Sequence, residues 1–455
     1  MSGLHALRHL KSVCVSILTN AIVRLRLLWG RPGLRRLTTN VGWLLADRLL
    51  RMIGGLLVGF WVARYLGPTD FGSYNYALAL AMIVGSVATL GLDNIVVRDL
   101  VRAPAESPAI LGSAAVLRLT SGLLAILIAV GVAALLRPGD QTAIALTTLF
   151  SLASPLQALS IIDLWFQSRV DSRDIVVARN AAFFAATTLK VSLLLAGAPL
   201  IAFGWVFAAE AVLGGLAVIV AYRRRGGRLR AWHPAAARAR SLLADSWPLI
   251  FSGLLVTLYL RIDQVMIGQI VGDTELGVYS IAVRIAEVFP MLPGVIIAST
   301  FPSVVAAREV DEALFYDRLR RLYALVAAIG YLSALAITVC APWLIYLLAG
   351  PGYASAAPML TVLIWASLFS GIGMARSTYL NTANLAHLHT ITVLLGCLVN
   401  IGLNWLLIPR MGGMGAAIAS LVAYWLAGHG SCYLIPKLRN TGNMLTHALL
   451  WPKFW

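Results

Sequence analysis

The sequence predicts an all-α, polytopic membrane protein with about 12 transmembrane helices in two six-helix lobes around a central cavity. Composition supports this prediction first, because 60% of the 455 residues are hydrophobic and only 12% are charged, whereas soluble domains carry about 25% charged residues. Apolar runs near the ~20 residues that a bilayer requires also follow one another along the chain. A third observation, an internal repeat, divides these runs into two halves.

The internal repeat is visible in a short turn that occurs twice. Gly67-Pro68-Thr69-Asp70-Phe71-Gly72-Ser73-Tyr74 is followed 205 residues later by Gly272-Asp273-Thr274-Glu275-Leu276-Gly277-Val278-Tyr279. Long apolar runs flank both turns, so each half is expected to begin with a similar helix, turn and helix. Internal repeats in a membrane chain are typical of transporters, whose substrate site lies where the repeats meet.

The elements are expected in the following order. Residues 1–38 form a basic amphipathic extension that suits an anionic membrane surface. An N-lobe, 39–222, and a C-lobe, 246–436, each contain six spans and are joined by a basic cytoplasmic linker, 223–245. The tail, 437–455, ends in aromatic residues typical of a membrane interface. The expected spans are 41–65, 73–94, 109–136, 142–166, 176–197, 200–222, 246–271, 276–304, 322–348, 355–380, 387–408 and 412–435.

Basic residues are distributed unevenly between the two sides of this layout. The side with both termini carries 25 of the 36 Lys and Arg residues, eight lie in or at the ends of spans, and the opposite loops hold only Arg64, Arg137 and Arg410. Cytoplasmic loops of membrane proteins are enriched in Lys and Arg. We therefore expect both termini to lie in the cytoplasm.

The eight basic residues in the spans predict a positively charged central cavity. A charge at the centre of a span costs roughly 2.5–3.5 kcal/mol on insertion scales, so such residues should face water, a ligand or a carboxylate. Arg suits bidentate contact with phosphate, and a site inside the bilayer suits an anion with a lipid tail. The candidate substrate-binding residues are Arg118, Lys190, Arg48, Arg51, Arg179, Arg261, Arg284 and Arg376.

These candidates differ in their predicted depth. Arg118 and Lys190 are expected deepest in their spans and are the strongest candidates for ligand contacts. A position near a span end, from which a long side chain can instead reach the interface, is predicted for Arg48, Arg51, Arg179 and Arg376.

Four acidic residues are candidates for ion coupling or for ion pairs. Glu210 could pair with Lys190 or titrate as a proton site. Arg284 and Glu287 are three residues apart on one predicted helix, so they could pair with each other. The four candidates are Asp47, Glu210, Asp263 and Glu287.

An ordered series of short motifs runs from about Thr39 to Tyr433. The series includes Asp47-Arg48-Leu49-Leu50-Arg51, Gly91-Leu92-Asp93-Asn94, Ser246-Trp247-Pro248-Leu249, Arg261-Ile262-Asp263-Gln264 and Leu407-Ile408-Pro409-Arg410. In these motifs and in its span layout the chain resembles the bacterial polysaccharide and O-antigen flippases of the Wzx type, within the MOP superfamily.

The resemblance implies a function. It implies movement of undecaprenyl-diphosphate-linked sugar repeat units from the cytoplasmic to the periplasmic leaflet, for O-antigen, capsule or exopolysaccharide biosynthesis. The diphosphate would meet the cationic residues, and transport would be ion-coupled alternating access, with antiport as the expected form. The implied location is the bacterial inner (cytoplasmic) membrane. The implied partners are the lipid-linked oligosaccharide and membrane lipids, with a polysaccharide polymerase and a chain-length protein as further candidates.

Three other functions remain open at this point. A multidrug or cation exporter of the same superfamily would favour an acidic cavity, and a lipid II-type flippase would work by a similar mechanism. A membrane polymerase or ligase of lipid-linked sugars would need a large outer loop, whereas the predicted outer loops are short. We expect no enzyme activity, no catalytic residue set, no cofactor, no metal site and no nucleic-acid partner.

Overall fold

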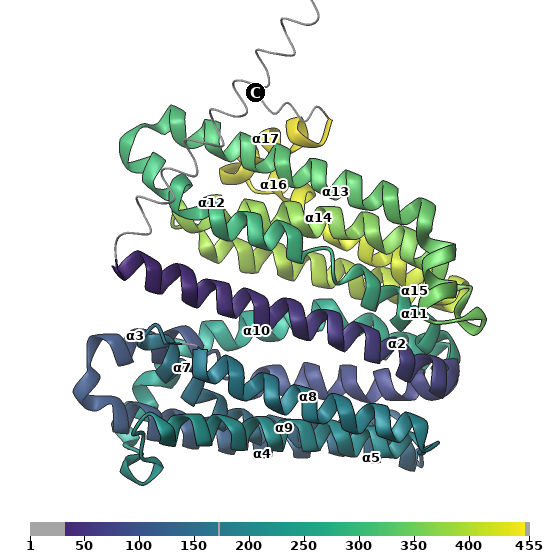
Figure 1. Cartoon of the computed structure of the whole chain (residues 1–455). Helices are drawn as coiled ribbons and strands as arrows, with labels where there is room; N and C mark the ends of the chain where they lie inside the picture. Colours follow the sequence, from purple (N-terminus) through teal and green to yellow (C-terminus); the bar gives the residue numbers. More distant parts are fainter. Residues whose placement is uncertain (1–31, 172, 451–455) are drawn as a thin grey trace, which may run out of the picture.

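The computed structural model describes residues 32–171 and 173–450, and it describes side chains from Leu50 onward. Within these ranges the regular structure is helical and contains no strand, which confirms the predicted all-α class (Figure 1). Most of the N-terminal extension and the aromatic tail end at Trp451, Phe454 and Trp455 lie outside the described residues, as do the side chains of Asp47 and Arg48.

The first half of the chain runs from α2 to α9. Its longest helix, α2, contains two helical segments joined at Gly67, where φ is +74°. A side chain other than that of glycine is strained in this left-handed region. The helices of this half are α2 (Pro32–Ala88), α3 (Asp93–Arg102), α4 (Ser107–Leu136), α5 (Gln141–Ser151), α6 (Ala153–Leu156), the 3₁₀ helix η2 (Gln157–Ser160), α7 (Ile161–Ser168), α8 (Arg173–Leu195) and α9 (Leu200–Arg224).

The second half repeats this pattern. Gly272, the counterpart of Gly67, also has a positive φ of +114° and precedes the first turn of α11. Gly412 breaks the longest helix of this half with a φ of +56°. The helices are α10 (Ala236–Ile270), α11 (Asp273–Ala286), α12 (Met291–Val310), α13 (Glu312–Leu348), α14 (Ala356–Thr382), α15 (Ala386–Trp425), the π-helix η5 (Leu426–Gly430), α16 (Ser431–Leu434) and α17 (Arg439–Leu450).

Nine segments of the described residues are long and apolar enough to cross a membrane, so the chain is a multi-pass membrane protein. Two of them, Leu50–Arg102 and Ala386–Leu434, contain 53 and 49 residues, more than twice the ~20 residues that one crossing needs. Each holds a glycine break, at Gly67 or Gly412, and therefore supplies two crossings. With α8, which is less apolar but has 23 residues, the number of crossings agrees with the predicted twelve.

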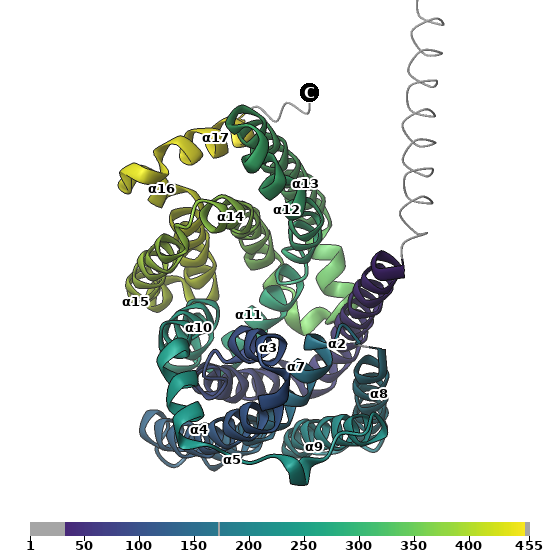
Figure 2. The ribbon, with the colours of Figure 1, turned by 90° about the vertical axis from the view of Figure 1, so that its left-hand side faces the viewer.

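The helices form two groups that meet along α2. Figure 2 shows α12–α15 on one side and α4, α5, α8 and α9 on the other, with α2, α10 and α11 between them. The predicted lobe boundary at 223–245 stays a prediction. The end of the bundle that holds the turns at Gly67 and Gly272 is called the turn end below, and the end that holds the linker is called the basic end.

Among the side chains that the structure describes, the apolar core is continuous between the two groups at the turn end. There, one cluster of buried side chains contains Phe71 and Tyr76 from α2 together with Leu276 and Tyr279 from α11. Towards the basic end the core separates. One cluster contains residues of the first half and Leu242 of α10, and another contains residues of α12–α17 alone. The two groups are thus packed tightly together at the turn end.

Candidate functional site

A cavity of about 280 Å³ lies within the first half of the chain. We call it the charged cavity, because Arg51, Arg179 and Glu210 line it together with the polar residues Gln157 and Ser160. The lining comes from α2, α6, η2, α8 and α9. Two of the predicted substrate-binding cations and one predicted coupling acid therefore share one cavity.

Ion pairs organise the cations around the charged cavity. The Nζ atom of Lys190 on α8 lies 2.6 Å from Oε2 of Glu210 on α9, which confirms the pairing considered from the sequence. Arg179 pairs with Asp163 at the start of α7. The guanidinium of Arg51 lies over the ring of Phe183, 6.0 Å from its centroid. Among the described residues, three cations and two carboxylates therefore lie around this cavity.

One wall of the charged cavity is an interrupted helix. After α5 ends at Ser151, the chain forms one short α-helical turn and the 3₁₀ helix η2 before α7 begins. Pro155 lies in this segment and has no backbone N–H to continue a helical ladder. Gly122 of α4 packs directly against it, because a Cβ at position 122 would lie 2.5 Å from Cα of Pro155. Interrupted helices are tolerated in membranes where they line a cavity or are buried in protein.

A second cavity of about 360 Å³ adjoins the first. It shares Ala153, Gln157 and Phe207 with the charged cavity and extends from α2 to Gly253 and Thr257 on α10. None of its lining residues is ionisable, so we call it the neutral cavity. The lining on α2 runs from Leu78 to Ser86 and continues to Thr89 just after the helix, beginning about 15 Å beyond the turn at Pro68 at 1.5 Å per residue. The neutral cavity therefore lies from mid-helix towards the basic end.

Arg118 and Arg376 line neither cavity in this conformation. Arg118 is only 2% exposed and donates to Asp93 Oδ1 at 2.7 Å and to Ser160 Oγ at 2.8 Å. Arg118 is therefore held from behind the charged cavity, by an acid that sequence analysis did not assign to it. Arg376 is buried within the second half, where its contacts are Thr392 at 2.7 Å, Ser431 at 3.1 Å and Cys432 at 3.3 Å. Its guanidinium is thus enclosed by protein groups, and its predicted position near a span end stays a prediction.

The remaining candidates lie where α10 and α11 approach α2. Glu287 pairs with Arg261, with 3.0 Å between Oε1 and Nη1, rather than with Arg284. The guanidinium of Arg284 instead lies 5.4 Å from the ring centroid of Phe71. It fits against Gly59, since a Cβ at that position would lie 1.7 Å from Arg284 Nη1.

Asp263 is the one coupling candidate with a described side chain that is fully buried. It accepts hydrogen bonds from the Tyr279 hydroxyl and from the backbone N–H of Gln264, the latter at 2.7 Å. No ion pair of Asp263 is present among the described residues. The described contacts of the Asp263 carboxylate are therefore hydrogen bonds within the protein.

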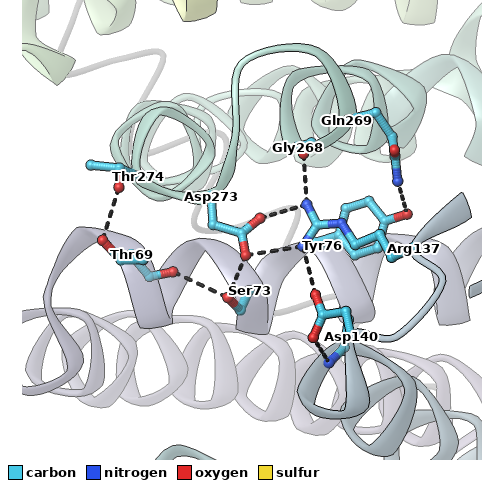
Figure 3. A network of polar contacts seen from close by, with 10 residues as sticks. Thr69, Ser73, Tyr76, Arg137, Asp140, Gly268, Gln269, Asp273 and Thr274 are labelled. Carbon is cyan, nitrogen blue, oxygen red and sulfur yellow. Dashed lines mark hydrogen bonds and ion pairs between the residues drawn. The ribbon is translucent and has the colours of Figure 1, made fainter.

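The turn end is closed by contacts between the two repeated turns. The hydroxyls of Thr69 and Thr274, which are equivalent residues of the repeat, lie 2.8 Å apart (Figure 3). The backbones are equally close, because a Cβ at Gly72 would lie 1.8 Å from the Asp273 carbonyl oxygen and one at Gly277 would lie 1.9 Å from that of Pro68. We call this set of contacts the turn clamp.

An ion pair reinforces the turn clamp. Arg137, in the loop between α4 and α5, binds both carboxylate oxygens of Asp273, at 2.5 and 3.0 Å. It also donates to the Gly268 carbonyl at 2.6 Å and lies 3.8 Å from the ring centroid of Tyr76 (Figure 3). Burial is the largest single influence on the pKa of the Arg137 guanidinium and lowers it, but the hydrogen bond to Asp273 and the attraction of that carboxylate, together with smaller contributions from Tyr76 and Asp140, raise the pKa overall.

Sequence analysis counted Arg137 only as a loop residue and gave no role to Asp273. One signal was available, since Asp273 occupies the position where the first turn has Pro68. An acid that replaces a proline in an otherwise similar turn indicates a partner cation.

Comparison with known proteins agrees with this fold. The family model for polysaccharide biosynthesis proteins matches residues 37–308, which is more than half of the chain. The MatE family model matches residues 248–406. A protein named "Probable flippase AglR" from Haloferax volcanii is 29% identical over 186 residues, which cover 40% of this chain and 39% of that protein. The aligned region thus spans about two fifths of the length of that relative.

The chain shares its fold with two solved structures of membrane transport proteins. An inward-facing multidrug resistance MATE family transporter of this superfamily has a TM-score of 0.71 at 14% identity, covering 87% of this chain and 95% of that one. The lipid II flippase MurJ, in an inward closed conformation, has a TM-score of 0.68 at 14% identity and covers 90% of each chain.

Proposed function

Because the chain belongs to the polysaccharide biosynthesis protein family, we propose that it is a flippase for lipid-linked oligosaccharide. In this proposal it moves undecaprenyl-diphosphate-linked sugar repeat units from the cytoplasmic to the periplasmic leaflet of a bacterial inner membrane, with both termini in the cytoplasm. The product would supply the synthesis of O-antigen, capsule or exopolysaccharide. A polymerase and a chain-length protein are the proposed partners downstream.

The charged cavity is the observation that carries this proposal. Arg51 and Arg179 line this cavity, and Glu210 of the same lining is paired with Lys190. Guanidinium groups bind phosphate oxygens in bidentate fashion, so these arginines are the groups that we propose to contact the diphosphate. Arg284, held beside Gly59 where α11 meets α2, is a further proposed contact. Arg118 would act through Ser160, which it orients at the wall of the charged cavity.

We propose alternating access as the transport mechanism. The turn clamp joins the two halves at the end assigned to the periplasmic side, while the apolar cores are separate towards the basic end. The substrate would enter from the cytoplasmic side in this conformation. Its release would require the turn clamp to open. Ion coupling is proposed for Asp263 first, since Glu210 and Glu287 are both engaged in ion pairs, and Asp47 remains a candidate.

The proposal is tested by replacing both cations that line the charged cavity, Arg51→Gln with Arg179→Gln. Transport of a polyprenyl-diphosphate oligosaccharide into the far leaflet of proteoliposomes should fall about tenfold or more, as expected for the loss of charge-assisted hydrogen bonds. The matched control is Arg320→Gln, an exposed arginine at the basic end. Undiminished transport by the double variant would exclude the charged cavity as the diphosphate site.

A multidrug exporter is the second candidate, and the match of the MatE model to residues 248–406 favours it. The two functions predict different phenotypes in cells that lack the protein. A flippase predicts accumulation of the lipid-diphosphate oligosaccharide in the cytoplasmic leaflet and loss of the surface polymer. An exporter predicts unchanged lipid intermediates and new sensitivity to cationic drugs.

A further inference from the structure

We propose that the neutral cavity is the binding subsite for the first, uncharged sugar of the substrate, with Gln157 as its specificity-determining residue. This inference rests on the proposed function, because it divides the lipid-linked substrate between two adjoining cavities. The diphosphate would occupy the charged cavity, and the sugar attached to it would extend past Gln157 into the neutral cavity.

The position of Gln157 is the first argument. It is one of three residues that line both cavities, and the other two, Ala153 and Phe207, carry no polar side-chain atom. A substrate that occupies both cavities must therefore pass this carboxamide. The bond between a diphosphate and its first sugar would lie at the same point. Among polar side chains, Gln157 is thus uniquely placed at the junction.

The hydrogen-bonding state of Gln157 is the second argument. In the part of the chain that the structure describes, no hydrogen bond of its side chain is found, although neighbouring polar groups are engaged. A carboxamide offers two donor hydrogens and one acceptor oxygen. This is the combination that binds a sugar hydroxyl or an N-acetyl group. The interrupted helix at Pro155 presents Gln157 at the start of η2, and its backbone is fixed there by the close packing of Gly122.

The chemistry of the neutral cavity is the third argument. Its polar lining consists of hydroxyls, from Ser86, Thr89, Ser154 and Thr257, and of the Gln157 carboxamide. Phe150 and Phe207 supply an aromatic surface, with ring centroids 4.9 Å apart. A mostly apolar lining with a few polar groups is typical of sites that orient an uncharged ligand. A uronic acid would bring a carboxylate into a cavity that has no cation to pair with it, which is unfavourable.

Thr257 extends this subsite to the second half of the protein. It lies on α10, and its hydroxyl donates to the Gly253 carbonyl at 3.0 Å, which leaves its oxygen able to accept a hydrogen bond. A sugar in the neutral cavity would consequently contact both halves, whereas the diphosphate in the charged cavity contacts the first half alone. Binding of the sugar would therefore depend on the relative position of α2 and α10.

The test measures equilibrium binding to the full-length protein in nanodiscs. Three probes carry the same polyprenyl diphosphate: one without sugar, one with a single N-acetylhexosamine and one with a single uronic acid. The wild type should bind the N-acetylhexosamine lipid more tightly than both other probes. Gln157→Leu should weaken binding of that lipid roughly 3- to 10-fold, as expected for one lost hydrogen bond, and should weaken binding of the sugar-free lipid clearly less.

The control variant is Gln167→Leu, which changes an exposed glutamine on α7 outside both cavities, and it should bind all three probes as the wild type does. Equal weakening of the sugar-bearing and sugar-free lipids by Gln157→Leu would overturn the subsite, as would no weakening at all. Preference of the wild type for the uronic acid would overturn the uncharged class. Failure of the wild type to bind any of the three probes would instead refute the proposed function.

Discussion

Neutralising either partner of the Arg137–Asp273 pair should open the turn end. The two side chains are 12% and 17% exposed, so solvent screens the pair only in part. A hydrogen bond to a charged group contributes about 1.5–3 kcal/mol, and Asp140 remains near Arg137 in a weaker contact at 3.4 Å. We therefore expect Arg137→Gln or Asp273→Asn to destabilise the closed form by about 2 kcal/mol, which is a factor of ~30 in the equilibrium.

This factor is large enough to measure. If the closed and open forms of the wild type are populated in a ratio of 99 to 1, this ratio would fall to about 3 to 1 after the change. The population can be followed by disulfide formation between Thr69→Cys and Thr274→Cys, because these hydroxyls lie 2.8 Å apart only when the clamp is closed. The assay needs a background in which Cys14, Cys340, Cys397 and Cys432 are replaced.

The matched control for the pair is Arg410→Gln, an exposed arginine that also lies in the loops of the predicted outer side. It should leave the cross-linking yield unchanged. The double variant Arg137→Gln with Asp273→Asn should lose little more than either single variant, since each single change already breaks the pair. Additive losses in the double variant, or full cross-linking in all three, would refute the assignment of this pair to the turn clamp.

Three further predictions concern close packing and the charged cavity. Gly277→Ala should force the turns apart, because the new Cβ would lie 1.9 Å from the Pro68 carbonyl oxygen, and the cross-linking yield should fall. The control Gly131→Ala, with open space around the new Cβ, should leave the yield unchanged. Gly59→Ala should displace the Arg284 guanidinium and reduce transport several-fold at an unchanged amount of protein, whereas Gly55→Ala, which meets no atom within 4 Å, should transport normally. Lys190→Met should leave Glu210 unpaired at a cost of about 1–3 kcal/mol and should lower the thermal midpoint of the purified protein. The double variant Lys190→Met with Glu210→Gln should recover most of the lost thermal midpoint. A stable single variant would show that Glu210 is well hydrated.

The helical repeat and its turns could be predicted because they rest on local chemistry. Apolar run length indicates a crossing, and glycine at positions 67 and 272 permits the positive φ that both turns adopt. The Lys190–Glu210 pair could also be predicted, since the two residues lie on consecutive predicted spans and carry opposite charges.

The contacts between distant helices could not be predicted in the same way. Arg118 pairs with Asp93, which is 25 residues away on another helix, and the sequence contains several acids at comparable distances. The partner is chosen by how α3 packs against α4, which one sequence read alone does not reveal. Arg284 likewise finds its place beside Gly59 only because α11 crosses α2 at that glycine.

The contact between Thr69 and Thr274 has a consequence for how this architecture is built. Six crossings separate the two turns, so they lie on the same side of the membrane and are related by an axis along the membrane normal. Residues that contact their own counterparts lie on such an axis. The same holds in a C₂ dimer, where both partners contribute the same surface patch to the interface. A single six-helix unit with this turn would therefore be self-complementary. In one chain the two turns need not be identical, and Pro68 and Asp273 are one position at which they differ.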